Sequence, residues 1–82
     1  MNQAIQFPDR EAWDEEKQAV CFPALVYGMQ LNCAISGETL LRRFGEEDPL
    51  VVFKANRWDL EEEASDLLRD QQEDDYGWVW LS

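Results

Sequence analysis

The chain has 82 residues, enough for a single small domain spanning residues 1–82, and a domain of this size buries only about 60 to 65 per cent of its unfolded surface. The hydrophobic share of 45% and the four Trp residues indicate a folded protein rather than a disordered one. The formal net charge of −11 disfavours direct binding to nucleic acid or to anionic lipid, because both are negatively charged.

The sequence carries no sign of a signal peptide or a membrane span, so we expect a cytoplasmic protein. It has no His and only two Cys. A zinc site with four nitrogen or sulfur ligands therefore cannot form within one chain. Acid–base and nucleophilic chemistry that depends on His is excluded as well, and no cofactor is predicted.

Two segments precede the main strand pattern. Residues 2–7 predict a short strand with Ile5 and Phe7 on one face, ending at Pro8, which we expect to join the sheet. Residues 10–18 are mostly charged, and Trp13 is their only large apolar residue. This segment predicts a loop or irregular turn that packs Trp13 against the domain.

Residues 20–35 predict a β-hairpin with Tyr27 and Gly28 as its two-residue turn. Gly28 supplies the positive φ that such a turn needs, whereas Tyr fits the first position less well than Asn or Asp. In the second strand apolar and polar residues alternate, as in a strand with one buried face. The register places apolar residues opposite one another: Val26 and Met29, Ala24 and Leu31, Phe22 and Cys33, Val20 and Ile35.

This register also makes predictions for Pro23 and the two cysteines. Pro23 faces Asn32 and has no N–H for a neighbour on its other side, so its strand is either an edge strand or has an outer neighbour that stops short of Pro23. Cys33 points into the core and Cys21 to the opposite face, which excludes a disulfide between them.

Two helices are predicted after the hairpin. Ser36 is suited to cap the first, which Gly45 ends. Asp48 and Pro49 predict the start of the second, preceded by the acidic pair Glu46 and Glu47. From residue 50 to 69 the apolar residues follow one arc, which favours one long helix. The alternative is a break near Asn56, with Asp59 and Glu62 forming a second capping box.

The chain closes with a strand at residues 78–81 that is apolar on both faces. Such a strand is either internal to the sheet or incompletely covered. Trp78 and Trp80 share one face, and their exposure would predict a dimer through this strand. The whole pattern predicts an α+β fold, in which an antiparallel sheet centred on the hairpin, with three N-terminal strands and one C-terminal strand, packs against two helices.

Between residues 46 and 75 there are twelve acidic residues but only three cations, Lys54, Arg57 and Arg69. On the predicted helix some acids repel one another at a spacing of four residues, as Glu62 and Asp66 do, at about 0.2 to 0.5 kcal/mol per pair. The pattern is therefore not tuned for helix stability. It indicates either a docking face for a basic partner or a device that keeps a small protein soluble.

We predict a non-catalytic module that contacts a basic protein and exists as a monomer or weak homodimer. Its predicted contact residues are Glu61, Glu62, Asp66, Asp70, Arg57 and Trp58. For Arg57, which lies within the apolar arc, the simpler interpretation is a packed stem with a guanidinium paired to a carboxylate. One alternative function is a nucleic-acid mimic that occupies the basic groove of another protein. Another is an enzyme with carboxylate chemistry, which exposed helical carboxylates disfavour because they lack the burial that separates two pKa values.

Four blocks of sequence resemble the YrdB type of short gammaproteobacterial proteins, a family of unknown function. They are MNQAIQFPDRE at the start, CFPALV-G-MQL-CAISGE in the hairpin and cap, RWDLEEEA in the helix and EDD-GWVWL at the end. Relatives typically have Asn where this chain has Tyr27, and they are longer between residues 41 and 49. The resemblance implies no activity, cofactor or catalytic residue.

Overall fold

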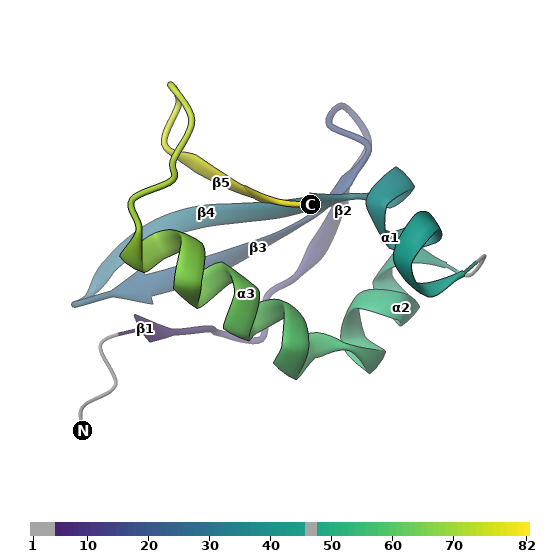
Figure 1. Ribbon diagram of the computed structural model, residues 1–82, viewed down its shortest axis with the longest axis horizontal. Coiled ribbons are helices and arrows are strands. Elements are labelled where there is room, and N and C mark those ends of the chain that lie inside the picture. The colour runs from purple at the N-terminus through teal and green to yellow at the C-terminus, as the bar shows by residue number, and fades with distance from the viewer. Residues whose placement is uncertain (1–4, 46–47) are drawn as a thin grey trace.

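The computed structural model describes residues 5–45 and 48–82. Within them one mixed sheet of five strands carries three helices (Figure 1). The strands are β1 (Ile5–Gln6), β2 (Ala12–Asp14), β3 (Ala19–Val26), β4 (Met29–Ser36) and β5 (Trp78–Leu81), and the helices are α1 (Gly37–Phe44), α2 (Pro49–Ala55) and α3 (Arg57–Arg69). The strand order is β1, β3, β4, β5, and β2 also pairs with β3. The α+β class is confirmed.

The predicted hairpin of β3 and β4 is confirmed, including its register. Tyr27 has φ 51° and Gly28 has φ 84°, the left-handed pair that a two-residue hairpin turn requires. Every second residue of each strand therefore faces the same side of the sheet, as the sequence pattern predicted. Cys33 is buried on the inner side and Cys21 is half-buried on the other, and both thiols are free.

Pro23 divides the outer neighbour of β3 into two short strands. β1 pairs with Leu25 and Val26, β2 pairs with residues 19–21, and Pro23 has no partner on either strand. The sequence left two possibilities for this strand: an edge strand, or an outer neighbour that stops short of Pro23. The structure shows the second. The prediction of a loop for residues 10–18 was wrong at Ala12–Asp14, because a strand of only three residues leaves too little alternation to recognise.

The last strand, β5, lies parallel to β4, with Val79 opposite Cys33 and Leu81 opposite Ile35. The predicted antiparallel sheet was therefore wrong in this strand, and the sheet has four N-terminal strands rather than three. A parallel partner needs a long crossover, which here consists of all three helices. β5 is an edge strand that buries Val79 and Leu81 on the helical side.

The predicted starts of the first two helices are confirmed. The Ser36 hydroxyl accepts a hydrogen bond from the Thr39 N–H at 3.0 Å, and the Asp48 carboxylate accepts one from the Leu50 N–H at 2.9 Å. Gly45, at φ 106°, ends α1 as predicted. Glu46, Glu47 and the first part of the predicted strand at residues 2–7 lie outside the described residues.

The prediction of one long helix was wrong, because Asn56 separates α2 from α3. Asn56 has φ −117° and ψ 24°, and its side-chain amide donates a hydrogen bond to the Val52 carbonyl at 2.9 Å. This contact ends α2 and redirects the chain. The capping box proposed for Asp59 and Glu62 does not form, since α3 begins without a side-chain cap.

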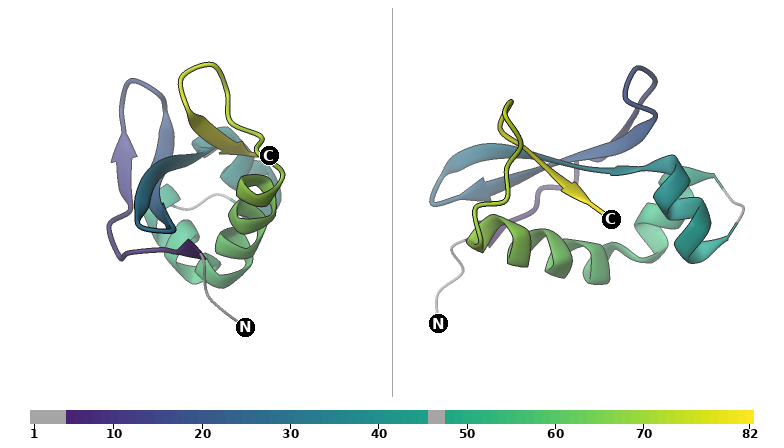
Figure 2. Two further views of the ribbon diagram at one scale, coloured as in Figure 1. Left: turned by 90° about the vertical axis from the view of Figure 1, so that its left-hand side faces the viewer. Right: turned by 45° about the horizontal axis from the view of Figure 1, so that its top comes forward.

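The helices pack on one face of the sheet, and the further views show no helix over the other face (Figure 2). At the centre of the core the rings of Phe22 and Phe53 lie 4.8 Å apart between centroids. Trp13 packs at its edge, as predicted. Among the described residues, no helix has the length and apolar character needed to cross a membrane. The buried core consists of Val20, Phe22, Ala24, Cys33, Ile35, Leu40, Val52, Phe53, Leu60, Ala64, Leu68, Val79 and Leu81.

Candidate interaction surface

Arg57 lies at the junction of α2 and α3 and is largely covered, with 19% of its side chain exposed. Its guanidinium forms ion pairs with Glu11, with Asp9 at 2.9 Å and with Glu61 at 3.1 Å. It also lies 5.5 Å from the centroid of the Phe53 ring. The packed stem and the carboxylate partner are as the sequence predicted. This arrangement joins the connection between β1 and β2 to the helices.

Glu11 is the least exposed carboxylate of this cluster, with 8% of its side chain exposed. Burial raises the pKa of Glu11. The hydrogen bond from Arg57, a backbone hydrogen bond and the charges of Arg57 and Lys54 together lower this pKa by more than burial raises it. The net effect keeps the pKa of Glu11 below its ordinary value. Glu11 is therefore ionised at neutral pH and neutralised by two cations, so it serves as a structural anchor.

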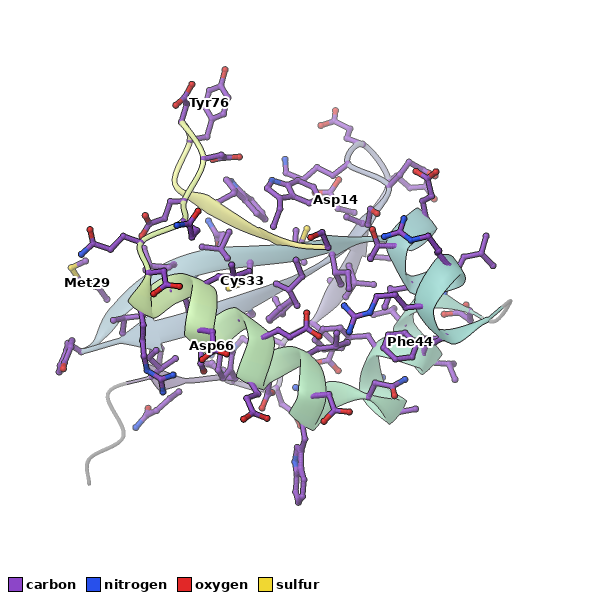
Figure 3. The ribbon with its side chains drawn as sticks, viewed as in Figure 1. Asp14, Met29, Cys33, Phe44, Asp66 and Tyr76 are labelled. Atoms are coloured by element: carbon purple, nitrogen blue, oxygen red, sulfur yellow. The ribbon has the colours of Figure 1, made fainter. Side chains whose placement is uncertain are left out.

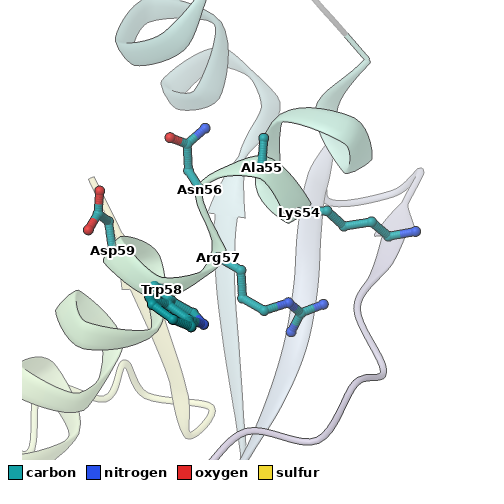
Figure 4. A pocket seen from close by; sticks show the side chains of 6 residues that line it. All are labelled: Lys54, Ala55, Asn56, Arg57, Trp58 and Asp59. Carbon is teal, nitrogen blue, oxygen red and sulfur yellow. The ribbon is translucent and has the colours of Figure 1, made fainter.

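Trp58 follows Arg57 directly in the sequence but is not covered, and 85% of it is exposed. Figure 4 shows Trp58 and Asp59 leaving the first turn of α3, while Lys54 and Arg57 extend from the junction with α2. These residues border an open depression of about 420 Å³. A Trp this exposed leaves most of a large apolar ring in water, which is unusual unless another surface covers it.

Trp58 begins an exposed row on α3 in which Glu62, Asp66 and the C-cap residue Asp70 follow at intervals of four residues. Residues four apart lie on the same helix face, about 6 Å apart along the axis. Asp59 lies beside this row and is also exposed. We name these five residues, Trp58, Asp59, Glu62, Asp66 and Asp70, the α3 stripe. Asp66 is labelled on α3 in Figure 3.

The predicted contact residues thus separate into two groups. Trp58, Glu62, Asp66 and Asp70 lie together on the exposed stripe, and only Asp66 has an ion-pair partner among the described residues, Arg69 at 3.2 Å.

Arg57 and Glu61 lie instead in the ion-pair cluster beside the core. Asp59 belongs to the stripe but was not predicted to be a contact residue. The sequence signal that could have identified Asp59 as a contact residue was its position directly after Trp58.

Glu63 is likewise not a free surface carboxylate, because it is paired with an arginine. Arg43 of α1 forms a two-pronged ion pair with both of its carboxylate oxygens, at 2.5 Å and 3.1 Å. The same guanidinium donates to the Ser82 carbonyl at 3.2 Å. Arg43 therefore links α1 to Glu63 of α3 and to Ser82, the residue after β5. Its hydrogen bond with Glu63 is the main reason why the pKa of Arg43 is raised above its ordinary value.

Across the described ranges, 5–45 and 48–82, no group of three or more Cys, Asp or Glu side chains is placed to hold a metal ion. The half-buried carboxylates of Glu11, Glu61 and Glu63 are paired with arginine, and those of the α3 stripe are open to water. The chemistry that this surface offers is attraction of cations together with one large aromatic contact.

Comparisons with a family model, with related proteins and with a solved structure all point to the same family. A family model described as "Protein of unknown function (DUF1488)" matches residues 5–81. The chain is 67% identical over 84 residues to "Uncharacterized protein YrdB" of Escherichia coli (strain K12) and to the protein of the same name of Shigella flexneri, covering 99% of each and 99% of this chain.

A solved structure is similar as well. It is the crystal structure, at 1.60 Å resolution, of a protein of unknown function from the DUF1488 family of Shewanella loihica PV-4. The TM-score is 0.92 at 30% identity, over 99% of this chain and 94% of the other. The resemblance noted from the sequence is confirmed by both relatives and structure.

Proposed function

The chain belongs to the DUF1488 family, and we propose that it is a non-catalytic cytoplasmic protein that binds a basic protein partner through the α3 stripe. The observation that carries the proposal is the exposed ring of Trp58 beside exposed carboxylates, of which only Asp66 has an ion-pair partner among the described residues. Trp is among the residues that contribute most to protein interfaces when they become buried. Carboxylates around such an anchor select a partner of opposite charge.

The distribution of the acids supports an interaction role over a purely solubilising one. Acidic residues that stabilise the fold, such as Glu11 and Glu63, are each paired with arginine. Those of the α3 stripe repel one another along a single face of the helix and reduce its stability. A protein that needs only solubility gains as much from scattered charge, whereas a continuous row also steers a basic partner toward the helix.

We further propose that the protein acts as a monomer. Trp78 on the edge strand β5 is half-buried and Trp80 is exposed, at 38%, but hydrogen bonds occupy part of the free edge of this strand. The backbone N–H of Trp78 donates to the Asp74 carboxylate at 2.9 Å, and its carbonyl accepts from the Asp74 N–H at 2.7 Å. The loop that carries Asp74 thereby occupies part of the strand edge and opposes pairing with a second sheet. Free thiols on opposite faces of the sheet agree with a reducing compartment.

The test is affinity capture from a bacterial lysate at low and high salt, comparing the wild type with Glu62→Lys/Asp66→Lys. The matched control is Glu16→Lys/Glu38→Lys, which gives the same net charge but alters exposed acids away from α3. The proposal expects a basic protein that is retained at low salt, released at high salt, lost with the α3 variant and kept by the control. No salt-sensitive partner, or equal loss with both variants, would refute it.

A competition assay separates ordinary docking from mimicry of nucleic acid. If the captured partner binds DNA or RNA, increasing amounts of the chain are added to a preformed complex of partner and nucleic acid. Release of the nucleic acid identifies the α3 stripe as a mimic of phosphates, and formation of a ternary complex identifies a separate docking site.

A further inference from the structure

A second pocket lies on the face of the sheet that the helices leave uncovered. It has a volume of about 480 Å³, and Lys17, Asp74, Tyr76, Trp78 and Trp80 line it. We name it the outer pocket. Trp78 and Trp80 point to this face because Val79 and Leu81, which alternate with them, face the core. Tyr76, labelled in Figure 3, lies at the tip of the loop before β5.

Hydrogen bonds hold the acidic side of the outer pocket in place. One oxygen of the Asp74 carboxylate accepts from the backbone N–H groups of Tyr76 and Trp78, at 2.8 Å and 2.9 Å. The other accepts from the Trp80 indole N–H at 3.3 Å. These bonds, the one from Trp78 foremost, hold the pKa of Asp74 below its ordinary value, so the carboxylate is charged at neutral pH. The pocket therefore combines aromatic faces with a fixed negative charge.

The pocket already contains a cation from the same chain. The Lys17 ammonium lies 4.8 Å from the centroid of the Trp78 ring, within the range of a cation–π interaction. Lys17 lies in the turn between β2 and β3, where its backbone N–H donates a hydrogen bond to the Asp14 carboxylate at 3.0 Å. Its ammonium makes no ion pair within 4.0 Å among the described residues. The Trp78 ring is therefore its contact in this pocket, and the Asp74 carboxylate also lines the pocket.

We propose that the outer pocket is a binding site for the ammonium of a lysine side chain on a partner protein, and that Lys17 occupies it in the free protein. Aromatic side chains beside a carboxylate form the environment that favours alkylammonium groups. Lys17 extends from an exposed turn, so an incoming lysine can displace it. The intramolecular contact lowers the apparent affinity by competition and reserves the pocket for partners that present lysine at high local concentration.

The outer pocket is independent of the α3 stripe. Its residues Trp78 and Trp80 lie on the opposite face of the sheet from the helices, and the two sites share no residue. Three of the four Trp side chains report separately on the two sites, because Trp58 belongs to the α3 stripe and Trp78 and Trp80 to the outer pocket. Trp13 packs at the edge of the core and belongs to neither site. Failure at one site can therefore be distinguished from failure at the other.

The experiment follows the indole N–H resonances of all four Trp residues by NMR, each assigned by single Trp→Phe variants. The ligand is the peptide acetyl-Gly-Lys-Gly-amide, and the uncharged control replaces its lysine with norleucine. We expect the Lys peptide to shift Trp78 and Trp80 saturably and the norleucine peptide not to shift them. Lys17→Met should bind the Lys peptide at least about threefold more tightly, and Asp74→Asn at least about threefold more weakly.

Arg42→Met is the matched control for Lys17→Met, because it removes one exposed positive charge that does not line the outer pocket. It should leave the affinity at Trp78 and Trp80 within about twofold of the wild type. Absence of a shift in both wild type and Lys17→Met would overturn the proposal. So would equal shifts with the norleucine peptide, or equal gains from Lys17→Met and Arg42→Met, which would indicate net charge alone.

Discussion

Arg57 and Glu11, 46 residues apart in the sequence, form an ion pair that fastens the connection between β1 and β2 to the break between α2 and α3. Both side chains are mostly covered, unlike those of the surface pair Arg69 and Asp66. A largely covered charge that loses its partner keeps its cost of desolvation. The pair therefore holds two layers of the fold together.

We expect Arg57→Met to lower the free energy of unfolding by about 1 to 3 kcal/mol, because it leaves the Glu11 carboxylate without its main donor. Arg69→Met, which removes an exposed pair, should change it by less than about 0.5 kcal/mol. Urea denaturation of both variants measures the difference. An equal effect would show that Arg57 contributes no more than a surface charge.

The same pair predicts a pH dependence. The pKa of Glu11 is lower in the folded state than in the unfolded state, so its contribution is present above the unfolded value of 4.5 and is lost as pH falls through the folded pKa. Glu11→Gln should flatten the stability profile in this acidic range. A profile with the same slope as the wild type would contradict the assignment.

The contact between Gly37 and Trp13 predicts a loss of stability in Gly37→Ala. A Cβ at residue 37 would lie 2.9 Å from an atom of the Trp13 ring. Helix propensity alone would favour Ala by about 1 kcal/mol, but overpacking of this kind costs about 1 to 3 kcal/mol. We expect net destabilisation in urea, with a smaller effect in a Trp13→Phe background. Equal effects in the two backgrounds would exclude the ring as the cause.

The hairpin turn predicts a stabilising substitution. Tyr27 has φ 51° and is 83% exposed, so it adopts a left-handed conformation without a packing benefit. Asn tolerates this conformation better, and Tyr27→Asn should raise the free energy of unfolding by about 0.5 to 1 kcal/mol. Tyr76→Asn, at an exposed residue without a positive φ, is the control and should give no such gain.

The hairpin illustrates what the sequence could predict. Its register follows from local alternation and from the turn at Tyr27 and Gly28, so one segment contained all the information needed. The missing N–H of Pro23 led to two alternatives, an edge strand or an outer neighbour that stops short of Pro23, and the second one holds. The strand of residues 12–14 escaped prediction because its order comes from pairing with β3 rather than from its own pattern.

The helix break and the ion-pair cluster were harder to predict for a related reason. Apolar residues keep the same phase across Asn56, so periodicity does not reveal the break there. Glu61 was predicted to face outward because the sequence cannot show that Arg57 draws it into a cluster with Glu11. The exposed row from Trp58 to Asp70 depends only on helical spacing, and it was largely predicted.

The thiols give another test, because burial raises the pKa of Cys33 to about 12 and also raises that of Cys21. At pH 8 a disulfide reagent should modify Cys33 only as fast as the protein unfolds, and Cys21 more slowly than a free thiol. Urea should make both react rapidly. Rapid native reaction of two thiols would contradict the placement of Cys33 in the core.

Titration of Cys33 also predicts a loss of stability in alkali. Its folded pKa exceeds the unfolded value of 9.0, so its contribution is complete below that value and declines as pH rises toward the folded pKa. Cys33→Ala should remove this component. The difference in unfolding free energy between wild type and variant should shrink above pH 9, and a constant difference would contradict the assignment.

The most direct test of the central claim is site-specific photo-crosslinking in bacterial cells, with a photoreactive amino acid at position 58 of the α3 stripe or at exposed Met29 as control. The account predicts an adduct with a basic protein from position 58 alone, and its loss in Glu62→Lys/Asp66→Lys. Identical adducts from both positions, or an adduct that survives the charge reversal, would contradict it.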